Sequence, residues 1–265
     1  MKKSIALSIA GSDTSCGAGI QVDLRMFSAC GVFGTTVLTA LTAQNPYEVT
    51  AVHGLPADFV RAQVDAILTR LPVTAIKTGM LWSPEIIDVV VETAKRYPHI
   101  PIVVDPVMIA TSGAKLISDD AIEKYKRDLL PLCALATPNA DEAKALLESQ
   151  TITKKTQRLS AKAFFEQYGC PILLKGGHLE GDPIDLLYDG KTFQDWVHPR
   201  IQTVNTHGSG CMLSAAITAE LAKSRSLGEA VSLGLDRIHE VLSHPVSLTA
   251  DLELANVEYL SSAST

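Results

Sequence analysis

Residues 4–27 read SIALSIAGSDTSCGAGIQVDLRMF and contain the pattern that predicts the fold. Residues 4–10 form a short apolar run, which is typical of a buried strand. A glycine-rich turn follows, and then Ile20, Leu24 and Phe27 recur at the spacing of one helix face. This stretch therefore predicts a strand, a tight loop and a helix in succession.

The same alternation continues along the chain. Further apolar runs, separated by amphipathic stretches, lie at residues 35–43, 74–79, 100–106, 133–139 and 171–177. Continuous apolar strands with helices between them indicate a mostly parallel sheet that is covered on both faces. Asp189-Gly190 then predicts a hairpin, and two helices are expected at about 208–223 and 226–242. We therefore predict an α/β fold with helices on both faces of the sheet.

The length of 265 residues suits one large domain, and no repeat, low-complexity tract or linker divides the chain. Hydrophobic residues make up 46% and charged residues 20%, which is typical of a folded protein and not of a disordered one. We expect a single domain over residues 1–265, with the last twenty or so residues weakly structured. The net charge of −6 provides no general attraction to nucleic acid or anionic lipid, so we expect neither as a partner.

Five cysteines, at positions 16, 30, 133, 170 and 211, form no CxxC pair and no metal-ligand spacing. Scattered thiols in odd number favour a reducing compartment, so we predict a cytoplasmic protein. Residues 4–10 follow two lysines, as in a secretion signal, but the run is short for such a signal and no cleavage-site pattern follows. No segment approaches the length of a transmembrane helix, so no membrane association is expected.

Polar and glycine-rich residues follow each predicted strand. The six strands are followed by GSDTSCGAG, AQN, KTGM, DPVM, TPNADE and KGGH. In open α/β sheets, ligands bind at the carboxyl ends of the strands. Each of these loops alone is ordinary, but six along one edge of the sheet predict a ligand site.

The segment THGSGC, residues 206–211, leads directly into a predicted helix. Glycines and the unpaired N–H groups of a helix N-terminus suit an anion. Phosphoryl transfer needs such a site, because charge spreads over the oxygens of the transferred group. The alternative is a tight turn in which Cys211 is a small buried hydrophobic residue. For this segment alone, the structural alternative is favoured.

In PNADE, Asn139 and Glu142 lie three residues apart and can face the same side of a starting helix. An amide and a carboxylate placed in this way can hold Mg²⁺ through water, since Mg²⁺ prefers oxygen ligands and keeps much of its hydration shell. Asp105, at the end of a strand, adds a carboxylate that could reach the same ion. The alternatives are a helix capping box for the first pair and a turn-forming role for Asp105.

Asp23 and Gln44 are candidates for recognising a small heterocycle, because a carboxylate and an amide can pair with ring nitrogens and an amino group. The alternatives are a solvated helix position for Asp23 and a polar strand end for Gln44. Lys175 is a candidate for a nucleotide phosphate, or else a solvated strand end. His178 and His207 show neither the order of a catalytic triad nor a metal-ligand spacing.

Taken together, these segments resemble the ribokinase-like superfamily, and most closely its hydroxymethylpyrimidine/phosphomethylpyrimidine kinases of thiamine biosynthesis. The matching strings are IAGSDTSCGAGIQVDL, LTALTAQN, IKTGML, VVDPVMIATSG, LLPLCALATPNADEA, LLKGGH and VNTHGSGCMLSAAI. They occur in the family's order and cover residues 5 to about 220, and the ordered set is far more specific than any one string. The resemblance implies a ribokinase-like three-layer sandwich.

The resemblance also implies a kinase that uses ATP and Mg²⁺ to phosphorylate 4-amino-5-hydroxymethyl-2-methylpyrimidine and then its monophosphate. Cys211 would occupy the position of the base, which is an aspartate in most sugar kinases of the superfamily. A helix N-terminus lowers the pKa of a thiol, so we expect a thiolate there. The resemblance further implies an anion hole at Gly208, Ser209 and Gly210, and metal binding by Asp105 and Glu142. It implies that the pyrimidine is bound by Gly11, Asp23, Gln44, Met80 and Val107. It implies that the nucleotide is bound by Asn139, Lys175 and Thr206. Relatives often dimerise, so a homodimer is a further expectation.

The chain departs from the family pattern at three places. Thr14 and Cys16 replace a proline and a glycine in the first loop. Ser209 and Met212 replace two threonines, and Met212 is expected to remove a hydroxyl beside the anion hole. The last predicted helix lacks an alanine–lysine pair that helps to wall the adenine pocket in the family, which predicts a weaker ATP site.

Other functions compete with this prediction. Pyridoxine and pyridoxal kinases act on related hydroxymethyl heterocycles, although Asp23 and Gln44 favour an aminopyrimidine. A pyrimidine-binding protein with weak catalysis would account for the altered last helix. A cysteine hydrolase that uses Cys211 would need a histidine within reach and would leave Asp105 and Glu142 without a role, so we rank it last.

Overall fold

The structure is a computed structural model that describes residues 3–108, 117–149, 151–179, 181–201, 206–249 and 252–262. Its main sheet consists of β1 (Ile5–Ala10), β2 (Phe33–Leu38), β5 (Ala75–Thr78), β6 (Ile102–Val104), β7 (Leu135–Ala136), β8 (Ile172–Leu174), β9 (Ile184–Tyr188) and β10 (Phe193–Val197). The strand order is β10-β9-β8-β7-β6-β5-β1-β2. All neighbouring strands from β2 to β8 are parallel, and only the β8–β9 and β9–β10 pairs are antiparallel. The predicted mostly parallel sheet is confirmed.

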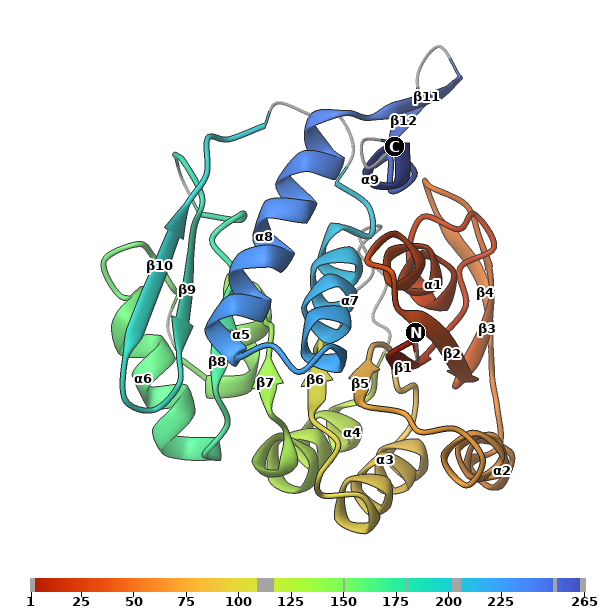
Figure 1. Cartoon of the computed structure of the whole chain (residues 1–265). Helices are drawn as coiled ribbons and strands as arrows, with labels where there is room; N and C mark the ends of the chain where they lie inside the picture. The colour runs from red at the N-terminus through yellow and green to blue at the C-terminus, as the bar shows by residue number, and fades with distance from the viewer. Residues whose placement is uncertain are drawn as a thin grey trace.

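Helices cover both faces of this sheet, which gives the three layers visible in Figure 1. One layer contains α1 (Gly19–Ala29), α7 (Ser209–Ala222) and α8 (Leu227–Ser243). The other contains α2 (Ala57–Leu68), α3 (Pro84–Arg96), α4 (Asp119–Lys124), α5 (Ala140–Leu147) and α6 (Gln157–Tyr168). Two short turns, η1 (Tyr125–Leu129) and η2 (Leu130–Leu132), continue α4. The predicted three-layer architecture is therefore confirmed.

Alternate residues of the central strands face the two layers. Ile76 and Val104 belong to the core under α2 to α6, whereas Ala75 and Val103 belong to the core under α1, α7 and α8. Side chains alternate across a strand, so burial on both faces requires apolar residues at every position. This requirement is what made the strands recognisable as continuous apolar runs.

The run at 35–43 was predicted as one strand but is divided between two sheets. β2 ends at Leu38, and β3 (Ala40–Gln44) pairs antiparallel with β4 (Val49–Gly54) in a separate two-stranded sheet. Buried Thr39 makes the break, because its N–H donates to the Ala10 carbonyl and its hydroxyl donates to the Met80 carbonyl at 2.6 Å. Because of this break, Gln44 belongs to a hairpin outside the main sheet and borders the cavity from there.

The C-terminal segment is more ordered than the sequence indicated. It contains β11 (Val246–Thr249), which pairs with β12 (Leu252–Leu254), and then α9 (Tyr259–Ser262). Val257 and Leu260 are buried in the same core as α1 and α7. Arg25 of α1 forms two short contacts with the Glu258 carboxylate, at 2.8 and 2.6 Å. The prediction of weak structure is therefore wrong for residues 246–249 and 252–262.

Several other expectations have clear outcomes. The hairpin at Asp189-Gly190 joins β9 to β10, and α7 and α8 lie where two helices were predicted. Ser226 and Glu229 form a capping box at the start of α8. Residues 109–113 and 204–205 of the family-like strings, and the last three residues of the chain, lie outside the described residues. In the described ranges, no helix is both long and apolar enough to cross a membrane.

Candidate active site

A cavity of about 430 Å³ lies at the carboxyl ends of the parallel strands. All of the candidate residues from the sequence border it except Asp23. They are Gly11, Gln44, Met80, Asp105, Val107, Asn139, Glu142, Lys175, Thr206, Gly208, Ser209, Gly210 and Cys211. Residues from all six of the predicted loops therefore line one cavity.

One end of the cavity is formed by Gly11, Gln44, Met80 and Val107. A Cβ at Gly11 would lie only 2.4 Å from Met80 Cε, so glycine lets the methionine pack over the loop. Thr14 anchors Gln44, because its hydroxyl accepts from the Gln44 N–H at 2.9 Å and donates to the Gln44 carbonyl at 2.5 Å. This end combines an apolar surface with one amide, which suits a flat polar heterocycle.

The turn before α7 packs against the first glycine-rich loop near the middle of the cavity. Gly208 has a φ of +74°, and a Cβ there would lie 1.8 Å from the Gly17 carbonyl oxygen. The Ser209 N–H is used within the turn, but in the described part of the chain those of Gly210 and Cys211 donate to no protein acceptor. Two such N–H groups at the start of a fourteen-residue helix form a site for an anion.

Asp13 and His207 hold these two loops together. The His207 Nε2 lies 2.9 Å from the Asp13 Oδ2, and both side chains are buried. Asp13 also accepts hydrogen bonds from the N–H and hydroxyl of Ser15 and from the Ala18 N–H. Burial raises the pKa of Asp13, but the hydrogen bonds from His207 and Ser15 outweigh burial, and the pKa is lowered overall. Sequence reasoning missed Asp13, because its partner is 194 positions away.

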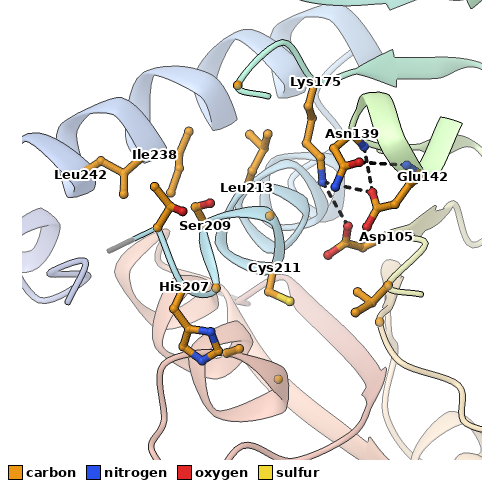
Figure 2. Close-up of a pocket in the computed structure, with 18 of the residues that line it drawn as sticks. Asp105, Asn139, Glu142, Lys175, His207, Ser209, Cys211, Leu213, Ile238 and Leu242 are labelled. Atoms are coloured by element: carbon orange, nitrogen blue, oxygen red, sulfur yellow. Dashed lines mark hydrogen bonds and ion pairs between the residues drawn. The ribbon is translucent and has the colours of Figure 1, made fainter. Parts of the chain in front are cut away.

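Beyond the anion site, Lys175 lies between two carboxylates (Figure 2). Its Nζ is 3.4 Å from Asp105 Oδ1 and 3.9 Å from Glu142 Oε2. Burial raises the pKa of Glu142 to about 7, with Lys175 opposing this shift and Asp105 adding to it. Two carboxylates facing one ammonium leave an excess of negative charge, which favours a further cation.

The two carboxylates fit a Mg²⁺ ion that keeps most of its water. Among the residues that the structure describes, no three His, Cys, Asp or Glu side chains are grouped as metal ligands. Mg²⁺ is usually bound through one or two carboxylates together with substrate phosphates and water. Asp105 and Glu142 supply that number of carboxylates beside the anion site, and a neighbouring cation would favour the charged form of Glu142.

Asn139 and Glu142 also form the capping box that was the alternative reading of PNADE. Asn139 Oδ1 accepts from the N–H groups of Asp141 and Glu142, each at 2.9 Å, and Glu142 Oε2 accepts from the Asn139 N–H at 2.8 Å. The capping alternative is confirmed. Since the Asn139 oxygen already accepts two hydrogen bonds, only its NH₂ group is left for a ligand, which suits a nucleotide oxygen and not a metal ion.

The opposite end of the cavity has an apolar wall and basic residues. The wall contains Leu213 from α7 and Ile238 and Leu242 from α8 (Figure 2). Leu235 of α8 lines the same cavity. The basic residues are His178, His198, Arg200 and His239, and Thr206 borders the same end. An apolar wall is therefore present even though α8 lacks the alanine–lysine pair of the family.

Met212 does not border the anion site. Its side chain is 1% exposed and belongs to the core under α1, α7 and α8. The expected loss of a hydroxyl beside the anion site is therefore corrected, because position 212 faces the core. Cys16 is exposed in the first loop and has a φ of +60°, a conformation that suits the glycine of the family pattern.

Asp23 does not reach the cavity. It is fully buried, both of its oxygens lie 2.8 Å from the Lys77 Nζ, and Oδ2 accepts a hydrogen bond from the Ser8 hydroxyl at 2.5 Å. This burial corrects the predicted contact with a heterocycle, and it also excludes the alternative of a solvated helix position. Lys77, which the sequence did not single out, borders the cavity instead.

Cys211 points into the cavity from the first turn of α7 (Figure 2). Burial raises the pKa of its thiol to about 12, although Lys77 acts in the opposite direction. The expectation of a thiolate rested on the helix N-terminus, whose effect is smaller than the cost of burying the charge. Cys211 is therefore a neutral thiol at neutral pH, and the prediction of a lowered pKa is wrong.

The chain matches the sequence profile of the phosphomethylpyrimidine kinase family over residues 13–255. It is 46% identical over 242 residues to the hydroxymethylpyrimidine/phosphomethylpyrimidine kinase of Rhizobium meliloti, with 90% of each chain covered. The kinase of the same name from Bacillus subtilis is 39% identical over 246 residues, covering 92% of this chain and 90% of the relative. The thiamine biosynthesis bifunctional protein ThiED of Geobacter sulfurreducens is 44% identical over 227 residues, but only 46% of that longer protein is spanned.

Solved structures show the same fold. The ADP complex of Bacillus subtilis pyridoxal kinase superposes with a TM-score of 0.89 at 32% identity, covering 98% of this chain and 99% of that one. The phosphomethylpyrimidine kinase of Clostridium difficile superposes with a TM-score of 0.79 at 39% identity, covering 90% and 99%. Sequence identity is higher to the pyrimidine kinase and overlap is higher with the pyridoxal kinase, so the fold does not separate the two acceptors.

Proposed function

Because this chain belongs to the phosphomethylpyrimidine kinase family, we propose that it transfers a phosphoryl group from ATP to 4-amino-5-hydroxymethyl-2-methylpyrimidine, and then to the monophosphate, in thiamine biosynthesis. One observation carries the proposal: a single cavity joins an end lined by Gln44 and Met80 to an apolar end, with an open helix N-terminus between them. A kinase needs this order of parts, because the phosphoryl group moves between two bound ligands.

The acceptor binds at the end formed by Gly11, Gln44, Met80 and Val107. The Gln44 amide pairs with the ring nitrogens and amino group, since an amide offers both a donor and an acceptor. Met80 packs on the face of the ring, supported by Ala40 and Val107 in a small apolar cluster. Asp23 is not part of this contact, because it is buried below the cavity.

The transferred group is held at the start of α7. The N–H groups of Gly210 and Cys211 donate to its oxygens, and Lys175 adds a positive charge on the other side. Asp105 and Glu142 hold Mg²⁺, which would neutralise charge on the ATP phosphates when bound. Positioning and electrostatic stabilisation of this kind account for most of the catalysis of phosphoryl transfer.

The nucleotide occupies the apolar end. Ile238 and Leu242 contact the base, while Thr206 and the Asn139 NH₂ group donate to phosphate oxygens. Structures of the Staphylococcus aureus pyridoxal kinase, at 30–31% identity, hold the ATP analogue AMP-PCP. That relationship supports ATP as the donor here.

Cys211 accepts the proton of the acceptor's hydroxyl group. In a largely dissociative transition state, deprotonation need not precede bond formation, so a small thiolate fraction is sufficient. We expect Cys211→Ala to lower kcat strongly while the Kd for the pyrimidine stays near normal. Cys16→Ser is the matched control, because it removes an exposed thiol of the first loop that does not line the cavity. Unchanged turnover in Cys211→Ala would remove the assignment.

Pyridoxal kinase is the second candidate function, and the structural overlap with the Bacillus subtilis pyridoxal kinase supports it. The higher identity to pyrimidine kinases and the Gln44 amide support the first. The hypothesis of a binding protein with weak catalysis rested on the altered last helix, and α8 does provide an apolar wall. That hypothesis is therefore no longer needed. The test is a reaction with ATP, Mg²⁺ and hydroxymethylpyrimidine, followed by mass spectrometry. Monophosphate and diphosphate products support the proposal, and the absence of both contradicts it.

We also infer a cytoplasmic protein that forms a homodimer. The five cysteines are unpaired, which suits a reducing compartment. Phe33, Leu41, Tyr47 and Phe59, on β2, the β3–β4 hairpin and α2, are 45–67% exposed. Exposed apolar side chains of this size are a feature of interaction surfaces. Light scattering at twice the chain mass would support the dimer, and the mass of one chain would contradict it.

A further inference from the structure

A buried ion pair lies directly beneath the cavity. Lys77, Asp23 and Ser8 are 0% exposed, and both Asp23 oxygens lie 2.8 Å from the Lys77 Nζ. An ammonium group has three donors, and Asp23 accounts for two of them. In the described part of the chain the third donor has no protein acceptor. Only Lys77 among these three residues borders the cavity, so the third donor is left on the cavity side.

Stability alone does not account for this pair. Removing two charges from water costs about as much as their attraction returns, so a buried pair is weak evidence for stability. A role in the site explains better why a fully buried ammonium lies at the cavity floor. Cys211 borders the same cavity as Lys77, and as a thiolate it is, after Asp23, the neighbour that most favours the charged form of Lys77.

Charged groups from four elements act on the Cys211 thiol, and all of them except Asp23 border the same cavity. Lys77 on β5 is the strongest of them, and it favours the thiolate. Asp105 opposes the thiolate, and Asp23 opposes it less strongly. Lys175, from the loop after β8, acts on the same thiol. The Gly19 N–H at the start of α1 also favours the thiolate.

We propose that Lys77 is a positioning residue of the reaction: held by Asp23 and Ser8, its ammonium stabilises the Cys211 thiolate that takes the proton of the acceptor's hydroxyl group. This inference rests on the proposed function. As the acceptor oxygen bonds to the γ-phosphorus and the bond to the β,γ-bridging oxygen breaks, the hydroxyl proton moves to Cys211 Sγ. The resulting thiol returns the proton to water before the next turnover.

The test replaces the ion pair by a neutral pair, Lys77→Met with Asp23→Asn, which leaves no unpaired buried charge. All variants carry Cys16→Ser, so that half-buried Cys211 is the most exposed thiol left. Alkylation of Cys211 by iodoacetamide is followed between pH 7 and 10, together with kcat and the Kd for hydroxymethylpyrimidine. The control is Lys124→Met with Asp88→Asn, a 2.6 Å ion pair outside the cavity.

The neutral pair should slow alkylation by roughly tenfold or more, since each pKa unit changes the thiolate fraction about tenfold. It should lower kcat by a similar factor and leave the Kd within about twofold, and the control should change none of these. A folded neutral-pair variant with an unchanged alkylation profile overturns the proposal. Alkylation needs no kinase activity, so this failure is distinct from failure of the proposed function.

A second measurement needs no variant at these positions. If the thiolate accepts the proton, the single-turnover rate of the unmodified protein should rise with pH, by roughly tenfold per unit between pH 7 and 9. Cys211→Ser should not show this rise, because a hydroxyl does not ionise in that range. A flat profile in the unmodified protein overturns the proposal even if the neutral-pair variant does not fold.

Discussion

Gly208→Ala is the substitution that most directly tests the anion site. Gly208 has a φ of +74°, and a Cβ there would lie 1.8 Å from the Gly17 carbonyl oxygen. Such a contact needs at least 3.0 Å, so the turn before α7 must move by about 1 Å from the first loop. A misplacement of about 1 Å can cost about 100-fold in rate. We expect kcat to fall by roughly that factor, because the N–H groups of Gly210 and Cys211 move with the turn.

Gly169→Ala is the matched control. Gly169 ends α6 with a φ of +66°, and a Cβ there would meet nothing within 4 Å. Both substitutions place alanine in the left-handed region, which costs about 1–2 kcal/mol. Only Gly208→Ala adds a collision, so it should lower the free energy of unfolding by more than Gly169→Ala does.

The assays are ATP consumption with hydroxymethylpyrimidine and denaturant unfolding. The expected pattern is a large loss of kcat for Gly208→Ala and a normal kcat for Gly169→Ala. If Gly208→Ala kept full activity, the turn before α7 would not be the site of phosphoryl transfer. An equal loss in the two variants would show that backbone strain, and not displacement of the anion site, is responsible.

Three further predictions concern Glu142 and Gln44. Glu142→Gln keeps a side chain that can complete the capping box but removes the charge. The Mg²⁺ concentration for half-maximal activity should therefore rise several-fold, with little change in stability at low pH. An unaltered Mg²⁺ titration would leave Glu142 with the capping role alone. The pKa of Glu142 is raised to about 7 by burial, so the folded state binds its proton more tightly and the free energy of unfolding should decrease from about pH 4.5 to 7. Denaturant titrations of Glu142→Gln should lack this decrease, and an identical pH dependence in both proteins would argue against the shift. Gln44→Ala should raise KM for the pyrimidine about tenfold and leave KM for ATP unchanged, whereas a change in the ATP value alone would place the acceptor elsewhere.

The layers of the fold could be predicted because burial on both faces imposes apolar residues on whole strands. The run at 35–43 is the instructive failure. Its β-branched and apolar residues continue without a glycine or proline, yet the chain changes sheets at Thr39. The break depends on hydrogen bonds from Thr39 to Ala10 and Met80, and such distant partners leave no local signal.

Most of the site could also be predicted, because loops at the carboxyl ends of parallel strands necessarily converge. The errors arose where the direction or depth of a side chain decided its chemistry. Asp23 follows the first loop, but its position on α1 turns it toward Lys77 of β5, in the interior of the sheet. Cys211 is at a helix N-terminus as expected, but burial outweighs that position and raises its pKa. Neither burial nor a partner distant in the sequence is visible in the local pattern.

The most direct test of this account compares kcat/KM for three acceptors with the same ATP and Mg²⁺: hydroxymethylpyrimidine, its monophosphate and pyridoxal. The account predicts turnover of both pyrimidines, with kcat/KM at least about tenfold above that for pyridoxal, the effect of one well-placed hydrogen bond. Turnover of pyridoxal with neither pyrimidine accepted would contradict the assignment.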